Sequence, residues 1–322
     1  MSALLGGKGA GLAEMTRMSV PVPPGFTITT DVCRQYMEAG ALTADHRSEI
    51  AEGLQWLESQ AGKRFGDPAD PLLVSVRSGA PVSMPGMMDT ILNVGLNDAS
   101  VIGLAAISGS ERFAFDSYKR LLQMFGSVVL GVPKTAFEQA SHALRAASAT
   151  NDVQVLRSEI EAFKAVIEQH TGSAFPQQPA QQLTMAVEAV FRSWHSERAR
   201  FYRGLNHISE AMGTAVTVQA MVFGNRGLDS GTGVGFTRNP STGAPGVFGE
   251  YLANAQGEDI VAGIRTPTPI AELSGQMPEV YGELAGLVER LEEHYKDTQD
   301  FEFTVESGKL FLLQTRSAKR SA

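Results

Sequence analysis

The stretch Gly224–Gly243 reads GNRGLDSGTGVGFTRNPSTG, and it follows an apolar run of strand-like composition, Ala215–Phe223. Glycines let the backbone approach a ligand closely, and Ser and Thr hydroxyls beside bare N–H groups bind anions. The stretch also carries Arg226 and Arg238. We therefore expect the chain to hold a nucleoside triphosphate under this loop, although ordinary turns have a similar composition.

The segments that flank this loop predict a protein of mixed helix and strand. From Ser110 to Gly204 the apolar residues recur at helical spacing, which predicts an inserted block of several helices. After Gly213 the period changes to two. The predicted strands are Ala215–Phe223, Gly233–Thr237, Gly246–Ala253, Glu258–Gly263, Phe301–Val305 and Leu310–Gln314. The pattern indicates an α+β fold with an all-helical insertion.

The C-terminal hairpin carries four polar side chains that we expect on one face. Residues two apart in a strand share a face, so Asp300 and Glu302 should lie on one face, and so should Gln314 and Arg316. A three-residue turn at Glu306–Gly308 would set Asp300 opposite Gln314 and point all four the same way. Two carboxylates and an amide oxygen suit Mg²⁺, and an adjacent arginine suits a transferring phosphoryl group. A solvated sheet face is the alternative, and a two-residue turn would separate the pairs.

Two further cations stand in positions that suit a polyphosphate. Lys8 lies in GGKG, which lacks the spacing of a Walker A motif, and Arg77 ends the apolar strand LLVSV. Each alone is typical of a solvated charge. Together with Arg316 they predict several cations converging on one polyphosphate.

The loop that follows Arg77 is rich in methionine. SGAPVSMPGMMDT contains Met84, Met87 and Met88. Flexible methionines fill irregular gaps in a core, and they also form adaptable walls against planar rings. The residues alone leave both interpretations open.

Composition excludes several classes of protein. The 322 residues are 43% hydrophobic and 19% charged, with a formal net charge of −8, so we expect no nucleic-acid partner and no membrane association. No apolar run of about 18 residues could span a bilayer. The single cysteine, Cys33, excludes an intrachain disulfide and a cysteine-based zinc site, and MSALLGGKGAGLAEM lacks a secretory signal. These features predict a cytoplasmic protein.

Seven strings resemble one known family in a single order along nearly the whole chain. They are LLGGKGAGLAEM, VPVPPGFTITT, DPLLVSVRSGAPVSMPGMMDTILNVGLND, GTAVTVQAMVFGN, SGTGVGFTRNPSTG, GEYLANAQGED and QDFEFTVESGKLFLLQTRSAKR. They closely resemble the N-terminal nucleotide-binding part of pyruvate, phosphate dikinase. The related phosphoenolpyruvate synthases share the general fold, but SGAPVSMPGMMDTILN resembles the dikinase branch.

The resemblance implies an ATP-grasp fold, in which two α+β subdomains hold ATP and Mg²⁺ and a helical subdomain is inserted. We expect 1–109 with 205–240 as the first subdomain, 110–204 as the helical insertion and 241–322 as the second subdomain. The family reaction converts ATP, phosphate and pyruvate into AMP, diphosphate and phosphoenolpyruvate through a histidine on a separate domain. No TSHA-like histidine motif occurs before Ala322. We therefore expect the phosphohistidine domain and the pyruvate domain to lie outside this chain, in cis or in trans.

The resemblance also assigns roles to residues by motif. Lys8, Arg77 and Arg316 resemble catalytic phosphate-binding cations, and Asp300, Glu302 and Gln314 resemble metal- and phosphate-handling groups. The other expected ATP contacts are Arg120, the ribose-binding pair Glu258 and Asp259, the phosphate lid Asp229–Gly233 with Ser230, Gly231, Thr232 and Gly233, and Met88 beside adenine.

Two alternative functions belong to other classes of protein. A stand-alone protein that binds or senses nucleotide without turnover should have a broken phosphate site, whereas Lys8, Arg77, Glu302, Gln314 and Arg316 are all present. A different ATP-grasp ligase would form an acyl phosphate, but the SMPGMMDT loop and the LQTR ending favour the dikinase type.

Overall fold

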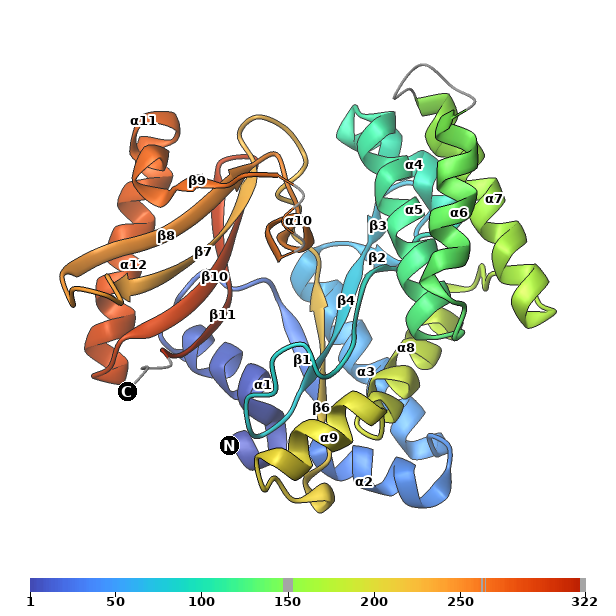
Figure 1. The fold of residues 1–322 in the computed structure, drawn as a ribbon, viewed down its shortest axis with the longest axis horizontal. Helices are drawn as coiled ribbons and strands as arrows, with labels where there is room; N and C mark the ends of the chain where they lie inside the picture. The colour runs from blue at the N-terminus through green and yellow to red at the C-terminus, as the bar shows by residue number, and fades with distance from the viewer. Residues whose placement is uncertain (147–152, 262, 264, 319–322) are drawn as a thin grey trace. The chain divides into compact units, whose positions relative to one another are not determined.

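The computed structural model describes residues 1–146, 153–261, 263 and 265–318, and the chain divides into two units. Unit 1 consists of Met1–Gly9 and Pro24–Met221, and unit 2 of Ala10–Pro23 and Val222–Ala322. Helix α1 (Ser2–Arg17) bends at Gly6, where φ is 67° and ψ is 171° (Figure 1). Its first turns belong to unit 1 and the rest to unit 2.

A four-stranded antiparallel sheet forms the centre of unit 1, with the strand order β1-β6-β4-β5. The strands are β1 (Gly25–Ile28), β6 (Ala215–Ala220), β4 (Val74–Gly79) and β5 (Thr90–Val94). Two short parallel strands, β2 (Arg64–Phe65) and β3 (Pro71–Leu72), pair separately. Strand β6 follows the helical segment in the sequence but lies between β1 and β4. The sheet therefore combines strands from both ends of the unit.

Some helices of unit 1 pack on its sheet and others pack on one another, and α2 and α3 contact β6 as well. Helix α8 packs on β4, β5 and β6, whereas α4, α5, α6 and α7 pack mainly on one another, with α5 also against β5 (Figure 1). The helices are α2 (Thr30–Ala39), α3 (Ala44–Ala61), α4 (Ser100–Ser108), α5 (Glu111–Val128), α6 (Lys134–Ala146), α7 (Val153–Thr171), α8 (Pro179–Ser193), α9 (Glu197–Leu205) and the 3-10 turn η1 (Glu210–Met212). The helical pattern predicted from Ser110 onward therefore corresponds to α5–α9.

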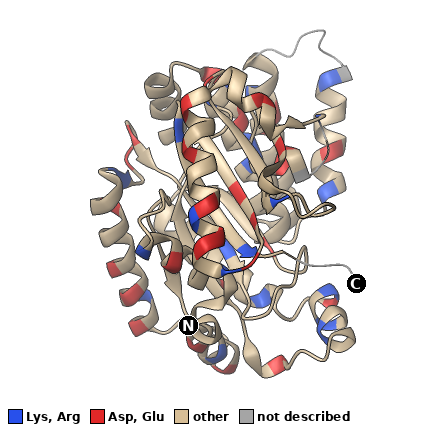
Figure 2. Cartoon of the chain, turned by 90° about the vertical axis from the view of Figure 1, so that its left-hand side faces the viewer, with Lys and Arg blue, Asp and Glu red and all other residues tan. Residues whose placement is uncertain are grey.

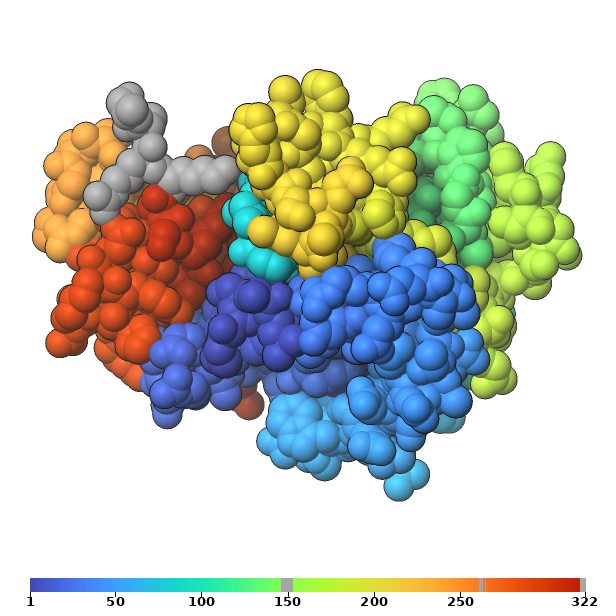
Figure 3. All heavy atoms as spheres, turned by 90° about the horizontal axis from the view of Figure 1, so that it is seen from below, coloured from blue at the N-terminus to red at the C-terminus, as the bar shows by residue number. Residues whose placement is uncertain are grey.

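Local sequence signals set several helix ends. The Thr43 hydroxyl accepts the backbone N–H of His46 at the start of α3, and Ser110 caps α5 by accepting that of Phe113. Gly40 and Gly62 end α2 and α3 with left-handed backbone angles. Figure 3 shows the segment after α9 against α2, where Arg34 Nη1 donates to the carbonyl oxygen of Met212 at 3.4 Å.

Unit 2 is a five-stranded antiparallel sheet, ordered β11-β10-β7-β8-β9, with helix α12 packed on one face. Its elements are β7 (Gly231–Arg238), β8 (Pro245–Ala253), α10 (Gly257–Val261), β9 (Thr268–Pro269), η2 (Ile270–Glu272), α11 (Leu273–Gln276), α12 (Pro278–Tyr295), β10 (Gln299–Glu306) and β11 (Lys309–Ser317). The core combines Leu284 and Leu291 of α12 with Phe301 and Phe303 of β10 and Met15 of α1. The opposite face of the sheet carries Asp300 and Glu302 of β10 opposite the apolar Phe236 and Val234 of β7.

The boundary between the units differs from the expected one. The prediction assigned 205–240 to the first subdomain, but the structure changes unit at Val222. Strand β7 is the reason, because it pairs with β10 on one side and β8 on the other and so belongs to the second sheet. Segment 110–204 lies within unit 1, and its role as a separate subdomain stays a prediction.

Acidic and basic residues are interspersed along the chain in Figure 2. Within the described ranges no helix is both long and apolar enough to cross a membrane.

Candidate functional site

Strands β10 and β11 meet at a two-residue turn. Ser307 and Gly308 have φ values of 49° and 74°, as in the type I′ turn that suits the twist of a hairpin. Glu306 pairs with Lys309 and Val305 with Leu310. The predicted three-residue turn is wrong, and the sequence argument would then place the two polar pairs on opposite faces.

A β-bulge restores the shared face. Phe303 lies opposite Leu312, but Glu302 lies opposite Gln314, so β11 contains the extra residue Leu313. An extra residue reverses the alternation of faces along a strand. Leu312 therefore points into the core, while Gln314 and the residues in phase with it point to the other side.

The four polar residues form two rows across the hairpin. Asp300 is opposite Arg316, and Glu302 is opposite Gln314. The shared face is as predicted, but the partners differ, because the prediction set Asp300 opposite Gln314. Arg316 Nε donates to Asp300 Oδ2 at 2.7 Å, so the bulge creates an ion pair that the predicted register lacks.

Gln314 brings an oxygen acceptor to this face without a matching donor. Its side chain is 8% exposed, and Oε1 is buried with no hydrogen-bond partner among the residues that the structure describes. Leaving such an acceptor unsatisfied costs about 1–3 kcal/mol. An orphaned oxygen beside two carboxylates suggests that the face is built for a ligand.

In unit 1, Arg77 lies in a row of hydroxyl groups that crosses the sheet. On β4 it is opposite Thr90 of β5 and Thr217 of β6, and Thr217 is in turn opposite Thr27 of β1. Residues directly opposite one another in antiparallel strands point to the same face. Arg77 Nη1 donates to Gln219 Oε1 at 3.4 Å, so the guanidinium group is held over this face.

The GGKG segment brings Lys8 to the same face. A Cβ on Gly6 would lie 1.7 Å from the carbonyl oxygen of Gly79, so only glycine fits there. A Cβ on Gly79 would lie 3.6 Å from Lys8 Cβ. Because Arg77 and Gly79 are two apart on β4, Lys8 begins on the face that carries Arg77. The structure therefore brings these two predicted cations together.

The family model described as the AMP/ATP-binding domain of pyruvate phosphate dikinase matches residues 2–60, 48–278 and 277–322. This chain belongs to that family. It is 54% identical over 329 residues to pyruvate, phosphate dikinase of Clostridium symbiosum and 53% identical over 327 residues to pyruvate, phosphate dikinase 1, chloroplastic, of Zea mays. The alignments include 100% of this chain but only 38% and 34% of those relatives.

The site residues expected from the family resemblance are divided between the two units. Lys8, Arg77, Met88 and Arg120 belong to unit 1, and all others belong to unit 2. Arg120, on α5, donates from Nε to Asp116 Oδ2 at 2.8 Å. Burial opposes ionisation of Asp116 most strongly, but Arg120 and Lys119 together lower the pKa of this carboxyl below its usual range. Arg120 is thus oriented by an ionised partner.

Met88 packs against protein in this structure. Met84 lies in a buried cluster with Trp194 and Ala199, and Met88 is a half-buried neighbour of that cluster. Arg198 Nε donates to the carbonyl oxygen of Met87 at 3.1 Å, which fixes the loop to α9. The packing interpretation of the methionines is supported, and the adenine contact stays a prediction.

The expected phosphate lid, Asp229–Gly233, is a buried strand for most of its length. Ser230 is fully buried, and its Oγ accepts the backbone N–H of Ser307 at 2.9 Å. Gly231–Gly233 belong to β7, where a Cβ on Gly233 would lie 2.3 Å from the ring of Phe303. These glycines permit close packing between strands, so the expectation of a loop is wrong for Gly231–Gly233, whereas Asp229 and Ser230 lie before β7 and outside any strand.

The predicted ribose-binding pair lies at the start of α10. The structure corrects the strand expected at Glu258–Gly263, since Gly257–Val261 is helical. Asp259 Oδ2 accepts the backbone N–H of Gln256 at 2.9 Å, and the residue is nearly buried. The carboxylate stabilises the turn into the helix, and its contact with ribose stays a prediction.

The sequence argument missed the residues that surround Arg77. Thr217 and Gln219 are two apart in GTAVTVQAM, so their alternation placed them on one face of the predicted strand. The pairing of β6 with β4 could not be read from that signal, because the two strands are separated by the whole helical segment.

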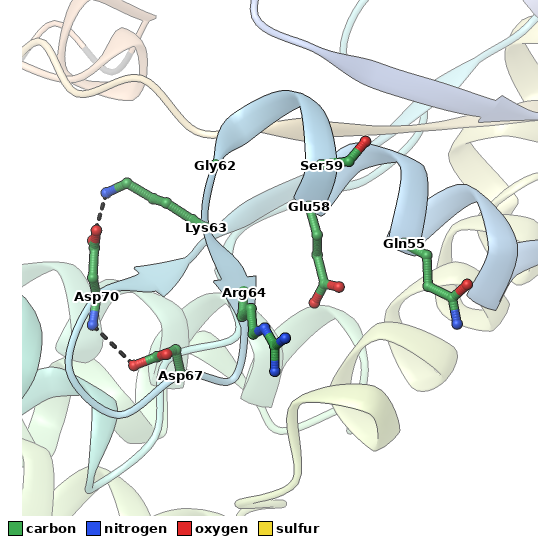
Figure 4. Close-up of a pocket in the computed structure, with 8 residues that line it drawn as sticks. All are labelled: Gln55, Glu58, Ser59, Gly62, Lys63, Arg64, Asp67 and Asp70. Atoms are coloured by element: carbon green, nitrogen blue, oxygen red, sulfur yellow. Dashed lines mark hydrogen bonds and ion pairs between the residues drawn. The ribbon is translucent and has the colours of Figure 1, made fainter.

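A separate hollow of about 500 Å³ lies in unit 1 beside the end of α3 (Figure 4). Several of its charged groups already have partners within the protein. Lys63 Nζ lies 2.6 Å from Asp70 Oδ1, and Glu58 accepts the backbone N–H of Phe65. Backbone N–H donors from Ala69 and Asp70 lower the pKa of Asp67. The hollow contains none of the predicted site residues.

Proposed function

We propose that this chain binds Mg-ATP and transfers a pyrophosphoryl or phosphoryl group to a histidine on a separate domain, present in cis or in trans. It would supply the ATP half of a reaction that converts ATP, phosphate and pyruvate into AMP, diphosphate and phosphoenolpyruvate. Membership of the dikinase family supports this proposal. The observation that carries it is the polar face of the β10–β11 hairpin, where the bulge aligns Asp300, Glu302, Gln314 and Arg316.

The donor set on this face fits Mg²⁺. Carboxylate and amide oxygens are hard ligands, and the buried Gln314 Oε1 lacks a partner in the described part of the chain. No three His, Cys, Asp or Glu residues of the described ranges gather as a metal site. Mg²⁺ commonly takes one or two protein carboxylates and completes its shell with water and substrate phosphates. When bound, the ion would offset negative charge on the phosphates.

The cations of the chain have the complementary task. Arg316 lies in the row beside the metal ligands and would contact the transferring phosphoryl group, where charge develops during transfer. Lys8 and Arg77 share a face of unit 1 and would bind the polyphosphate. The remaining proposed ATP contacts are Met88, Arg120, Ser230, Gly231, Thr232, Gly233, Glu258 and Asp259.

Binding and transfer can be tested separately. Calorimetry should detect Mg-ATP binding to the folded chain at millimolar nucleotide or below, and absence of heat would refute the ATP site. ATP labelled at the β-phosphate should then label a separately supplied phosphohistidine domain from a relative. A domain whose acceptor histidine is replaced by alanine is the control.

The alternative is a protein that binds or senses nucleotide without turnover. It predicts heat in the first experiment and no label transfer in the second.

A further inference from the structure

A network of ion pairs that includes Arg120 connects helices α5, α6 and α7 of unit 1. Glu159 of α7 is fully buried, and its Oε2 lies 3.3 Å from Lys119 Nζ of α5. Its Oε1 accepts from Arg145 Nε of α6 at 2.9 Å and from the Ser141 hydroxyl. A buried carboxylate is tolerated only when it is paired and hydrogen-bonded, as this one is.

Asp116 lies at the other end of the network, between two cations. Its Oδ2 accepts from Arg120 Nε at 2.8 Å, and its Oδ1 lies 3.5 Å from Lys119 Nζ. Lys119 therefore contacts both Asp116 and Glu159. Lys119 is attracted electrostatically to Glu159. This attraction limits how strongly Lys119 competes with Arg120 for Asp116.

The position of α5 places Arg120 over β5. The backbone carbonyl of Ser117 accepts from Asn93 Nδ2 at 3.1 Å, and Met124 Sδ accepts the backbone N–H of Leu92 at 3.2 Å. Arg120 lies between these contacts along the helix. Strand β5 also carries Thr90, which is directly opposite Arg77.

We propose that Glu159 is a positioning residue for the nucleotide site: by holding Lys119, it leaves Asp116 to orient Arg120 toward the polyphosphate. The proposal rests on the proposed function, because it takes Arg120 as a phosphate contact. It gives the α6–α7 pair a role in ATP binding, although neither helix contributes a predicted site residue.

The test compares ATP and AMP affinity by calorimetry. Replacing Glu159→Gln frees Lys119 to engage Asp116, so ATP should bind about tenfold more weakly, equivalent to about 1.4 kcal/mol. AMP affinity should change less than twofold, because AMP has only one phosphate and therefore depends less on contacts with Arg120. Adding Lys119→Gln to Glu159→Gln removes the competitor and should bring ATP affinity back to within about threefold of the unmodified chain.

Arg157→Gln is the matched control. Arg157 is two residues before Glu159 on α7 and also pairs with α5, through Glu111 at 3.2 Å, but at an exposed position. It should leave both affinities unchanged. If Glu159→Gln does not fold, Asp116→Asn tests the same step, with the same selective loss of ATP affinity.

Three results would overturn the positioning role. They are an unchanged ATP affinity in Glu159→Gln, an equal loss of ATP and AMP affinity, and a double variant weaker than the single one. Each presupposes that the unmodified chain binds Mg-ATP. Failure of that binding would instead remove the proposed function, and the positioning role with it.

Discussion

The carbonyl oxygen of Gly79 occupies the space where a side chain on Gly6 would begin, 1.7 Å from an ideal Cβ. Gly6 also has a φ of 67°, which L-residues rarely adopt. Gly6→Ala should therefore destabilise the chain by about 1–3 kcal/mol and weaken ATP binding through displacement of Lys8. Thermal unfolding and calorimetry measure the two effects.

Gly7→Ala is the control for that substitution. A Cβ there meets its nearest neighbour, the carbonyl oxygen of Ala80, at 3.5 Å, which is an ordinary contact. Equal destabilisation by the two alanines would contradict the steric argument.

Replacement of Arg316 should separate transfer from binding. Arg316→Ala should reduce phosphoryl transfer to a supplied histidine domain by about 10²-fold or more, with a smaller loss of ATP affinity, because its contact strengthens as charge develops. Single-turnover labelling and calorimetry provide the measurements. Lys309→Ala, an exposed change on the same strand, should leave transfer intact. Unchanged transfer in Arg316→Ala would refute the assignment.

Gln314→Leu should act in opposite directions on stability and on metal dependence. It removes a buried acceptor that has no partner in the described structure, so the free energy of unfolding without metal should stay the same or rise by about 1 kcal/mol. The Mg²⁺ concentration needed for half-maximal ATP binding should increase. A large loss of stability would show that the amide has a structural role.

Acid should weaken the α5–α6–α7 network. Burial favours the neutral form of Glu159, but Arg145, Ser141 and Lys119 outweigh it and lower the pKa of this carboxyl. Because the folded pKa lies below the unfolded one, the stabilisation is present above the usual carboxyl range and is lost as pH falls through the folded value. Urea unfolding should show a difference between the unmodified chain and Glu159→Gln that shrinks below about pH 4. A difference independent of pH would contradict the ionised state.

Cys33 should report on unfolding. Its side chain is fully buried, and burial raises the pKa of the thiol to about 11. The thiolate is the reactive form, so a thiol reagent at pH 8 should label Cys33 only when unit 1 opens. Rapid labelling of the native chain would show that this part of the unit opens readily.

Sequence patterns predicted the main elements and the chemistry of the hairpin. Alternation identified Gln314 and Arg316 as a pair on one face, since this depends on neighbouring residues only. The helical period identified α5–α9 for the same reason. The α+β class and the family followed from these elements and from the motif strings.

Pairing between distant strands could not be predicted in this way. The glycines of β7 looked like a loop because their composition suits a turn as well as a strand packed tightly against Phe303 and Tyr251. The bulge at Leu313 was also invisible, because it depends on which β11 residues can enter the core beside α12. Glu258 and Asp259 were placed in a strand because five residues are too few to distinguish the two periods.

The bulge also determines which length changes this hairpin can survive. Deleting Leu313 alone would remove the bulge but keep Leu312 opposite Phe303 and Gln314 opposite Glu302, so each would stay on its own face. A one-residue gap at this position in an alignment of related chains is therefore compatible with the same polar face. Regular pairing that retained Leu313 would instead turn Gln314 and Arg316 away from Asp300 and Glu302.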